Sequence, residues 1–242
     1  MKQPPPIGKL PADAIGPRLE PAIDPATFAA YLALPDLTGN VSDAMDLLNL
    51  SGAVGAVILR PSIPKARIAG PALTVKNALR EEPVPAVVAR KDNRLGDIEA
   101  HNIATPGDVL VVQGVEGVSS LGGISAAIGQ RQGEIGIIVD GLVRDIEASR
   151  TMGLPVWAKG TTPVTGKWRV QTEGVNVPIT ICGVTVEPGD LVLADETGVC
   201  FVPRAELDRV LKTAQSLAEE ETSRLQRIAD GVPIGNLSKP PR

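Results

Sequence analysis

Two glycines stand where the chain could bind a small anion. Gly122 and Gly123 come directly before a segment with a helical pattern. The first backbone amides of that helix, on Gly123, Ile124 and Ser125, would have no acceptor inside the helix. Free amides at a helix N-terminus attract a carboxylate or a phosphate. Residues 122–125 are therefore a predicted substrate-binding segment; the alternative is a tight turn with no ligand.

A charged cluster follows one helix and one strand later. The apolar run 135–139 leads into Asp140, and Arg144 and Asp145 come soon after. Parallel α/β sheets bind ligands beyond the carboxyl ends of their strands. Arginine holds a carboxylate with two hydrogen bonds, and a carboxylate holds a hard cation such as Mg²⁺. The cluster predicts a site for a metal ion and an organic acid. Alternatively, Arg144 pairs with Asp140 while Asp145 begins a helix.

Composition limits the other kinds of chemistry. The 242 residues carry a net charge of −4 with scattered basic residues, so we expect no nucleic-acid partner. One histidine, His101, is present, and Cys182 and Cys200 fit neither a zinc site nor a disulfide framework. No apolar run reaches the roughly 20 residues of a membrane-spanning helix, and the N-terminus lacks a signal-peptide pattern. We expect a cytoplasmic protein that does not contact the membrane.

Alternating apolar patterns predict the elements that hold these residues. Strands are expected at 53–59, 67–75, 108–114, 134–140 and 154–160, and helices at 97–104, 124–133 and 144–153. Gly133 and Gly153 should end the last two helices. This alternation favours an α/β fold with parallel pairing. The stretch 177–203 has short strands joined by Asn, Gly and Pro turns, which favours antiparallel or mixed pairing.

The two ends differ from the centre. Residues 1–24 contain six prolines and predict an extended arm, either free or tied to a neighbour. Residues 25–231 predict one domain, with helices starting at Pro25 and at Ser42 and a long helix over 204–231; residues 232–242 are a tail. The arm and the apolar stripe of the long helix would leave surface uncovered, which predicts a homo-oligomer.

Several motifs taken together resemble the RraA-like superfamily over roughly residues 35–231. They are VSDAMDLL, GPALTV, PGDVLVV, GGISAAIGQRQGEIGIIVDGLVRD, GLPVWAKGTTP and PGDLVLADETGVCFVP. This superfamily includes metal-dependent 4-hydroxy-4-methyl-2-oxoglutarate/4-carboxy-4-hydroxy-2-oxoadipate aldolases and regulators of RNase E activity. The resemblance implies an α/β/β/α swivelling-type domain with mixed sheets and a long C-terminal helix. It also implies a trimer, or a hexamer of two trimers, with active sites between subunits.

The resemblance also implies roles for individual residues. Arg144 would contact the substrate and its developing enolate, Asp145 would bind Mg²⁺ or Mn²⁺ partly through water, and the amides of 122–125 would bind the pyruvyl carboxylate. The aldolases carry an acidic residue 21 positions before this arginine, where the present chain has Gly123. That acid organises the catalytic water and the metal hydration, so its replacement bears on the aldol chemistry but leaves the anion and metal elements intact.

The identity of the acid/base group stays open. In the aldolases an acidic residue on the C-terminal helix of a neighbouring subunit contributes, and the local matches are Glu219, Glu220 and Glu221, although such glutamates are often merely solvated. His101 is a second candidate because imidazole transfers protons near neutral pH, although a lone histidine is more often structural. Further candidates for substrate contact, against ordinary surface charge, are Arg90, Lys91, Arg94, Lys159 and Thr161.

These observations predict a divalent-metal-dependent lyase acting on a small 2-oxo acid. The reaction would be retro-aldol cleavage of a 4-hydroxy-2-oxo acid or decarboxylation of an oxaloacetate-like acid, since both pass through a pyruvate enolate. One alternative is a non-catalytic RraA-like protein that binds or regulates a partner. Another is a related lyase or dehydratase that acts on a sugar acid.

Overall fold

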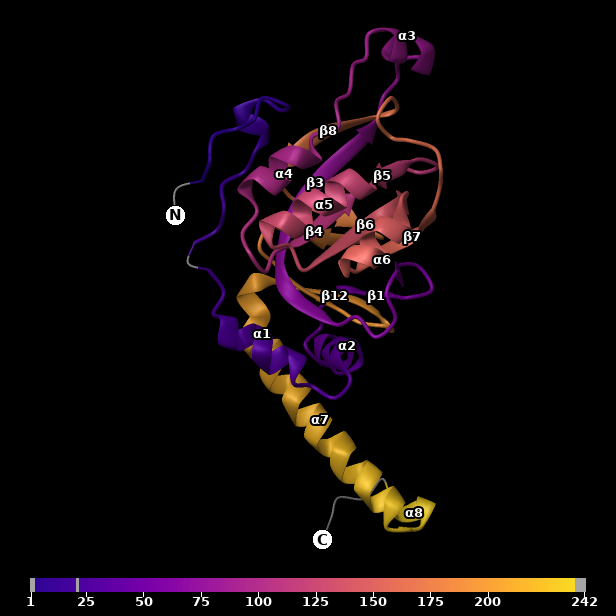
Figure 1. Cartoon of the computed structure of the whole chain (residues 1–242). Coiled ribbons are helices and arrows are strands. Elements are labelled where there is room, and N and C mark those ends of the chain that lie inside the picture. The colour runs from indigo at the N-terminus through magenta and orange to yellow at the C-terminus, as the bar shows by residue number, and fades with distance from the viewer. Residues whose placement is uncertain (1–2, 21, 238–242) are drawn as a thin grey trace.

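The strand β3 (Ile68–Leu79) joins the two halves of a ten-stranded sheet. In the computed structural model, which describes residues 3–20 and 22–237, its first part pairs antiparallel with β11 (Leu191–Ala194). Its second part pairs parallel with β4 (Val109–Gln113). One strand therefore passes from an antiparallel half into a parallel half, and the sheet is mixed, as predicted (Figure 1).

The remaining strands extend each half outward from β3. The parallel half continues through β6 (Gly136–Val143) and β7 (Val156–Thr161), with β5 (Ser119–Leu121), β8 (Val170–Val175) and β2 (Arg60–Pro61) at its margins. The antiparallel half continues through β12 (Gly198–Val202) and β1 (Ala53–Gly55). A separate hairpin consists of β9 (Ile179–Ile181) and β10 (Val184–Val186).

Helices cover the outer faces of both halves (Figure 1). The antiparallel half is covered by α1 (Pro25–Leu32), α2 (Leu37–Leu47) and the long α7 (Leu207–Ala229). The parallel half is covered by α4 (Asp97–Ile103), α5 (Gly123–Gln132) and α6 (Ile146–Met152). Short helices lie elsewhere: α3 (Val84–Ala89), α8 (Ile234–Leu237) and the 3₁₀ turns Ala12–Ala14 and Arg204–Glu206.

Three apolar cores separate the layers. Val41 and Val210 pack with Leu193 between the helices and the antiparallel half. Trp157 and Phe201 are almost fully buried between the two sheet halves, and a third core lies between the parallel half and its helices. Burying a large apolar side chain stabilises a fold by about 1.5–3 kcal/mol. The order of layers is the predicted α/β/β/α arrangement with a long C-terminal helix.

Glycines end the helices of the parallel half, as predicted. Gly133 (φ 88°) and Gly153 (φ 73°) are the C-caps of α5 and α6, and both are in the left-handed region that glycine enters without steric cost. These two stops fix where the following strands β6 and β7 begin.

Several predicted boundaries were wrong, and one of them is the end of β3, which continues to Leu79, four residues beyond the predicted strand 67–75. The helix α2 begins after Asp36, whose carboxylate accepts a hydrogen bond from the Gly39 amide, and Ser42 lies inside it. Aspartate is one of the strongly preferred N-cap residues, because its carboxylate accepts from the free amides of the first turn. Only Ala53–Gly55 of the expected strand 53–59 is extended. The strand β6 continues to Val143, three residues beyond the predicted end, because β5 and β7 both pair with this part.

The N-terminal arm lies along its own chain. The buried carboxylate of Glu99 accepts hydrogen bonds from the amides of Ile7 (2.8 Å) and Lys9 (2.6 Å). Further along the arm, Arg18 forms an ion pair with Asp108 at 2.6 Å. Residues 1, 2 and 21 of the arm, and residues 238–242 of the predicted tail, lie outside the described residues. Among the described helices, none is both long and apolar enough to span a membrane.

Candidate active site

The glycine turn and the charged pair are neighbours in the structure. Gly122 is the N-cap of α5, and Arg144 and Asp145 connect β6 to α6. The Gly123 amide donates a hydrogen bond to Asp145 Oδ2 at 3.0 Å, and Arg144 Nε lies 3.5 Å from the same oxygen. The parallel pairing of β5 with β6 brings the two connections together. These residues form the candidate active site.

Close approach explains both glycines. A β-carbon at position 122 would lie 3.1 Å from Arg144 Nε and 3.2 Å from Asp145 Oδ2. A β-carbon at position 123 would lie 3.1 Å from the Asp145 β-carbon and 3.2 Å from that of Ala148. Such contacts are tight enough that the neighbours would have to move by a few tenths of an ångström. Gly123 thus lets Asp145 lie directly against the start of α5.

An unusual backbone conformation directs Asp145 toward the glycine turn. Asp145 has φ 57°, in the left-handed region, and its side chain makes no capping bond to its own helix α6. A non-glycine residue held there costs roughly 1–3 kcal/mol. The surrounding chain holds it in place, since the Arg144 amide donates to the Leu121 carbonyl (3.0 Å) and the Ala148 amide to the Asp145 carbonyl (2.9 Å).

The charges of the site remain accessible to a ligand. The side chains of Arg144 and Asp145 are 41% and 49% exposed, and an ion pair this exposed adds little stability. The first-turn amides of Ile124 and Ser125 have no acceptor within the helix. The site therefore offers a guanidinium group and helix amides to an anion, beside a carboxylate that suits a cation.

The donor set fits a hydrated hard cation. One oxygen of Asp145 accepts from Gly123, which leaves its second oxygen for a metal. Across the part of the chain that the structure describes, no group of three or more His, Cys, Asp or Glu side chains is gathered for metal binding. Mg²⁺ is commonly held by one or two carboxylates and several waters, whereas zinc takes three or four protein ligands. Asp145 therefore suits Mg²⁺ or Mn²⁺ bound largely through water.

Asp140 does not belong to this site, which corrects the prediction of one cluster with Arg144 and Asp145. It lies inside β6, and its side chain is on the same face as Ile138, toward the β9–β10 hairpin. Asp140 Oδ2 accepts the Cys182 amide at 2.6 Å, and Lys159 forms an ion pair with the carboxylate. Burial alone would raise the Asp140 pKa, but the Cys182 amide and Lys159 outweigh it and lower that pKa.

The cysteines are free thiols with weak acidity. Burial raises the pKa of both Cys182 and Cys200 to about 12, and nearby carboxylates add to the rise. Thiolates, not thiols, are the reactive form. Neither cysteine is therefore suited to act as a nucleophile near neutral pH.

Three of the other candidates for substrate contact already have charged partners. Lys159 pairs with Asp140, while Thr161 ends β7 beside Val143. Arg94 Nε lies 3.1 Å from the Asp92 carboxylate, and Arg90 pairs with Glu82; all four residues lie in the segment between β3 and α4 that contains α3. Lys91 has a left-handed backbone with φ 53°.

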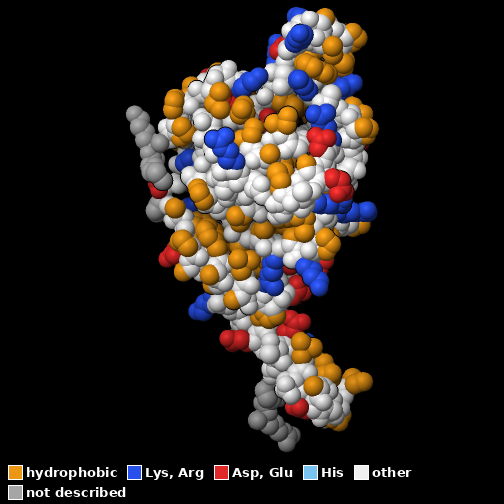
Figure 2. Space-filling model, in the orientation of Figure 1, with side chains coloured by type: hydrophobic (Ala, Val, Ile, Leu, Met, Phe, Trp, Pro, Cys, Tyr) orange, Lys and Arg blue, Asp and Glu red, His pale blue; other side chains and the backbone are white. Residues whose placement is uncertain are grey.

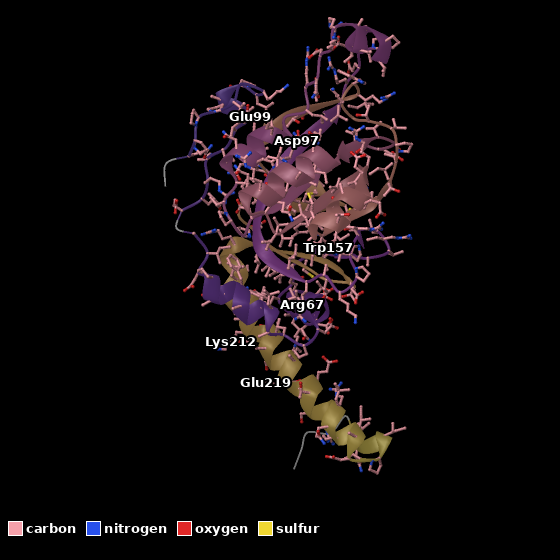
Figure 3. All side chains as sticks on the ribbon, viewed as in Figure 1. Arg67, Asp97, Glu99, Trp157, Lys212 and Glu219 are labelled. Carbon is pink, nitrogen blue, oxygen red and sulfur yellow. The ribbon has the colours of Figure 1, made fainter. Side chains whose placement is uncertain are left out.

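The glutamates of α7 lie far from the glycine turn within one chain. Figure 3 shows Glu219 about halfway along α7, and comparison with Figure 1 places it below the antiparallel half of the sheet, whereas α5 covers the parallel half. Glu221 accepts a hydrogen bond from Asn40 of α2 at 3.2 Å. Any contribution of these glutamates to the site would have to come from a neighbouring copy.

His101 and Ser125 are connected, which the sequence alone did not indicate. His101 Nε2 lies 2.9 Å from Ser125 Oγ, and His101 Nδ1 lies 2.7 Å from Glu134 Oε1. Glu134 was missed because a glutamate after a helix-ending glycine usually faces solvent. The only available signal was its place between Gly133 and a strongly apolar strand.

Comparisons with known proteins agree with this fold and these motifs. The family model RraA-like (Aldolase/RraA) matches residues 38–201. A "Putative 4-hydroxy-4-methyl-2-oxoglutarate aldolase" of Halalkalibacterium halodurans is 32% identical over 195 residues, which is 79% of this chain and 84% of that protein. A Thermus thermophilus protein named 4-hydroxy-4-methyl-2-oxoglutarate aldolase is 36% identical over 99 residues, covering 40% of this chain and 60% of that one.

Solved structures show the same architecture. RraAS2 of Streptomyces coelicolor, described as an unusual member of the RNase ES inhibitor RraA protein family, superposes with a TM-score of 0.69 at 25% identity, covering 84% of this chain and 98% of that one. An uncharacterized protein from Pseudomonas syringae pv. tomato has a TM-score of 0.73 at 24% identity, covering 90% and 98%, and bears on the fold alone. From the family match and these relatives, the chain belongs to the RraA-like family.

Proposed function

We propose that this protein is a Mg²⁺- or Mn²⁺-dependent lyase that cleaves a small 2-oxo acid to release pyruvate. The observation that carries the proposal is the convergence of the Gly122–Gly123 turn with Arg144 and Asp145, held by the bond from the Gly123 amide to Asp145. Family members named as 4-hydroxy-4-methyl-2-oxoglutarate aldolases support the same class of substrate.

Substrate binding would use the positive side of the site. The amides of Ile124 and Ser125 at the start of α5 favour the substrate carboxylate, because the helix dipole and the free N–H groups both attract an anion. The Arg144 guanidinium adds a planar donor pair that matches a carboxylate and the adjacent 2-oxo oxygen. Together they fix the oxo acid with its reacting carbons beside Asp145.

Both candidate reactions break the bond between C3 and C4 of the substrate. In retro-aldol cleavage C4 leaves as a carbonyl compound, and in decarboxylation it leaves as CO₂. In each case the electron pair of the broken bond moves toward the 2-oxo oxygen and gives the enolate of pyruvate. Arg144 would stabilise the negative charge that develops on that oxygen.

Asp145 would hold the divalent ion close to the 2-oxo group. When bound, the ion supplies Lewis-acid polarisation of that group. Asp145 also accepts the Gly123 amide, so the metal-holding carboxylate and the anion-binding helix turn are fixed relative to each other. The two reactions differ in one requirement: retro-aldol cleavage needs a base for the 4-hydroxyl proton, whereas decarboxylation does not.

A coupled assay tests this proposal. Purified protein with Mg²⁺ is given 4-hydroxy-4-methyl-2-oxoglutarate or oxaloacetate, and pyruvate is followed by NADH oxidation with lactate dehydrogenase, corrected for the rate without protein. We expect pyruvate release that EDTA abolishes and that added Mg²⁺ or Mn²⁺ restores. If neither acid releases pyruvate above that background and EDTA changes nothing, the lyase proposal is wrong.

A second candidate is a non-catalytic binding or regulatory protein. Gly123 at the position of the aldolase acid favours it, as does the similarity to RraAS2. Crystals soaked with Mg²⁺ and oxalate distinguish the two. If the protein is a lyase, we expect an ordered ion at Asp145 and oxalate against the start of α5. If it is a regulatory protein, we expect neither.

A further inference from the structure

Three buried polar side chains are hydrogen-bonded in series, and the series ends at Ser125 in the first turn of α5, the helix that begins at the candidate active site. Ser125 Oγ lies 2.9 Å from His101 Nε2, and His101 Nδ1 lies 2.7 Å from Glu134 Oε1. His101 is fully buried, and Ser125 and Glu134 are 8% and 3% exposed. We call these three residues the buried relay. None of the steps derived above uses His101 or Glu134.

Packing of α4 against α5 builds the buried relay. His101 comes from α4, Ser125 from the first turn of α5, and Glu134 follows the glycine that ends α5. The Glu134 carboxylate lies against the backbone of Gly129, where any side chain would collide with Glu134 Oε2. The Gln132 side chain donates to the His101 carbonyl at 2.8 Å and ties the same two helices together.

A neutral imidazole beside an ionised Glu134 fits both hydrogen bonds, and the placement of the protons follows from that assignment. An ionised carboxylate only accepts, so His101 Nδ1 carries the proton that it donates to Glu134. His101 Nε2 then has a free electron pair and accepts the hydroxyl proton of Ser125. A hydroxyl hydrogen-bonded to an imidazole that a carboxylate orients is the arrangement that activates serine for proton transfer.

Stability alone does not account for the buried relay. Burying an ionisable pair costs several kcal/mol per ion, and apolar side chains of similar size are often equally or more stabilising. Glu134 Oε2 is buried and accepts no hydrogen bond from the described residues. The chain thus keeps a titratable pair at an energetic cost, next to a site that needs a proton acceptor.

We propose that His101, acting through the Ser125 hydroxyl, is the group that takes up and returns the proton in the lyase reaction. Ser125 is the third residue of α5, and helical side chains lean toward the helix N-terminus, here the Gly122–Gly123 turn. Gly123 leaves this site without the carboxylate that the aldolase pattern has there. The inference rests on the proposed function and names the acid/base group for it.

The proton path balances over one turnover. Ser125 Oγ takes the 4-hydroxyl proton of the substrate while its own proton moves to His101 Nε2, and Glu134 stabilises the resulting imidazolium. The C3–C4 bond breaks, C4 becomes a carbonyl carbon, and the electron pair forms the pyruvate enolate. His101 then returns its proton through Ser125 to C3, which gives pyruvate and restores the neutral imidazole.

The single histidine allows a test that does not require turnover. In protein labelled with ¹⁵N-histidine, every imidazole signal belongs to His101. The probe is oxalate with Mg²⁺, which carries the paired oxygens of a pyruvate enolate, and calorimetry measures its binding. We expect the Nδ1–H tautomer in the free protein and a shift of the Nε2 signal on binding. Ser125→Ala should abolish this shift, whereas Ser149→Ala, a buried serine of α6, should keep it.

The outcomes separate the two proposals. If oxalate and Mg²⁺ bind and the His101 signals stay unchanged, the relay is wrong and the lyase proposal stands. If they do not bind, the site itself is wrong. The loss of the shift in Ser125→Ala alone supports the relay.

Kinetics give an independent readout on the 4-hydroxy-2-oxo acid. His101→Gln and Glu134→Gln should each lower kcat by about 10²- to 10⁴-fold, the usual contribution of general acid–base catalysis, with little change in KM. Decarboxylation of oxaloacetate needs no base for a hydroxyl proton and should fall less. Circular dichroism establishes that each variant is folded. The relay would be overturned if a folded variant kept its kcat within about threefold of the parent. It would also be overturned if kcat fell by the same factor on the 4-hydroxy-2-oxo acid and on oxaloacetate.

Discussion

Under the proposed function, both the shape and the charge of Arg144 contribute to the reaction. Its guanidinium is 41% exposed and only 3.5 Å from Asp145, so it gains little from that ion pair and is free to bind a ligand. Arg144→Lys keeps the positive charge but loses the planar donor pair. We expect kcat/KM for pyruvate release to fall by about 10²- to 10³-fold, as for the loss of one strong transition-state contact.

The matched control for Arg144 is Arg209→Lys, which changes an exposed arginine paired with Glu206 on the surface. It should behave like the parent. If Arg144→Lys also stays within about threefold of the parent, a difference of only about 0.65 kcal/mol, then Arg144 has no part in the reaction.

If Asp145 holds a divalent ion as proposed, Gly123 limits the metal affinity of the site. Gly123→Asp would add a second carboxylate next to Asp145, at the cost of a shift of a few tenths of an ångström in α6. A second carboxylate strengthens Mg²⁺ binding, and we expect about a tenfold gain in affinity, equal to about 1.4 kcal/mol. Titration calorimetry measures it. Gly123→Ala controls for the shift alone, and equal Mg²⁺ affinity in the two variants would contradict the placement of the metal at Asp145.

The sequence supported some residue-level predictions better than others. Glycines before a helix and an Arg-Asp pair after a strand are visible in the residue types, and the structure brings these two segments together. Asp140 lies inside β6 and not beyond its end, because the neighbouring strands extend β6 to Val143. The partnership of His101 with Glu134 depends on how α4 packs against α5, which no local pattern encodes.

At the level of elements, Asp195 ties α2 to the turn between β11 and β12. Its carboxylate accepts hydrogen bonds from the Thr38 amide (3.0 Å), the Thr38 hydroxyl (2.7 Å) and the Thr197 amide (2.8 Å). Burial raises the Asp195 pKa, but these hydrogen bonds outweigh it, so the pKa is lower than in the unfolded chain. The stabilisation is therefore present above the unfolded pKa and is lost as pH falls through the folded pKa.

The lowered pKa of Asp195 leads to a prediction about stability. Asp195→Asn should lower the free energy of unfolding at pH 7 by about 1–3 kcal/mol, because buried donors lose a charged acceptor. The variant should also lose less stability than the parent between pH 6 and pH 3. Urea unfolding at several pH values measures both effects, with Asp13→Asn in the arm as an exposed control. A parent and variant that respond equally to acid would contradict the role of Asp195.

The boundaries of helices and strands were predicted accurately where a local sequence signal determines them. Gly133 and Gly153 stop helices by backbone conformation alone, so the sequence placed both stops correctly. The start of α2 was misplaced because Asp36 and Ser42 are both good caps, and only the packing of Leu37 and Val41 into the core selects the first. The segment between β3 and α4, which contains α3, shows no clear hydrophobic periodicity, and α3 was not predicted.

At the level of the whole molecule, the distal part of α7 extends away from the body (Figure 1). Apolar side chains are exposed there, at Leu225 (58%), Ile228 (52%) and Ile234 of α8 (87%), and the end of the molecule carries an apolar surface (Figure 2). Exposed apolar surface of this kind usually marks an interface. We propose that copies of the chain cover it, in a trimer or a hexamer.

Light scattering tests the assembly. We expect three or six times the chain mass of 25.2 kDa at micromolar concentration. The double substitution Leu225→Glu with Ile228→Glu should lower the mass, because it places charge on the exposed stripe. Thr213→Glu, an exchange at a partly exposed position on the body-proximal part of α7, should leave the mass unchanged. A parent mass near that of one chain would contradict the proposed assembly.

The most direct test of the account is the metal-dependent release of pyruvate by Asp145→Asn. Asparagine keeps the shape of the side chain and its bond from the Gly123 amide, but it removes the charge that would hold a divalent ion. With the substrate that the parent turns over, we predict a loss of at least about 10²-fold, while circular dichroism and the melting temperature stay close to the parent. A folded variant that releases pyruvate within about threefold of the parent rate, with the same sensitivity to EDTA, would place the active site elsewhere.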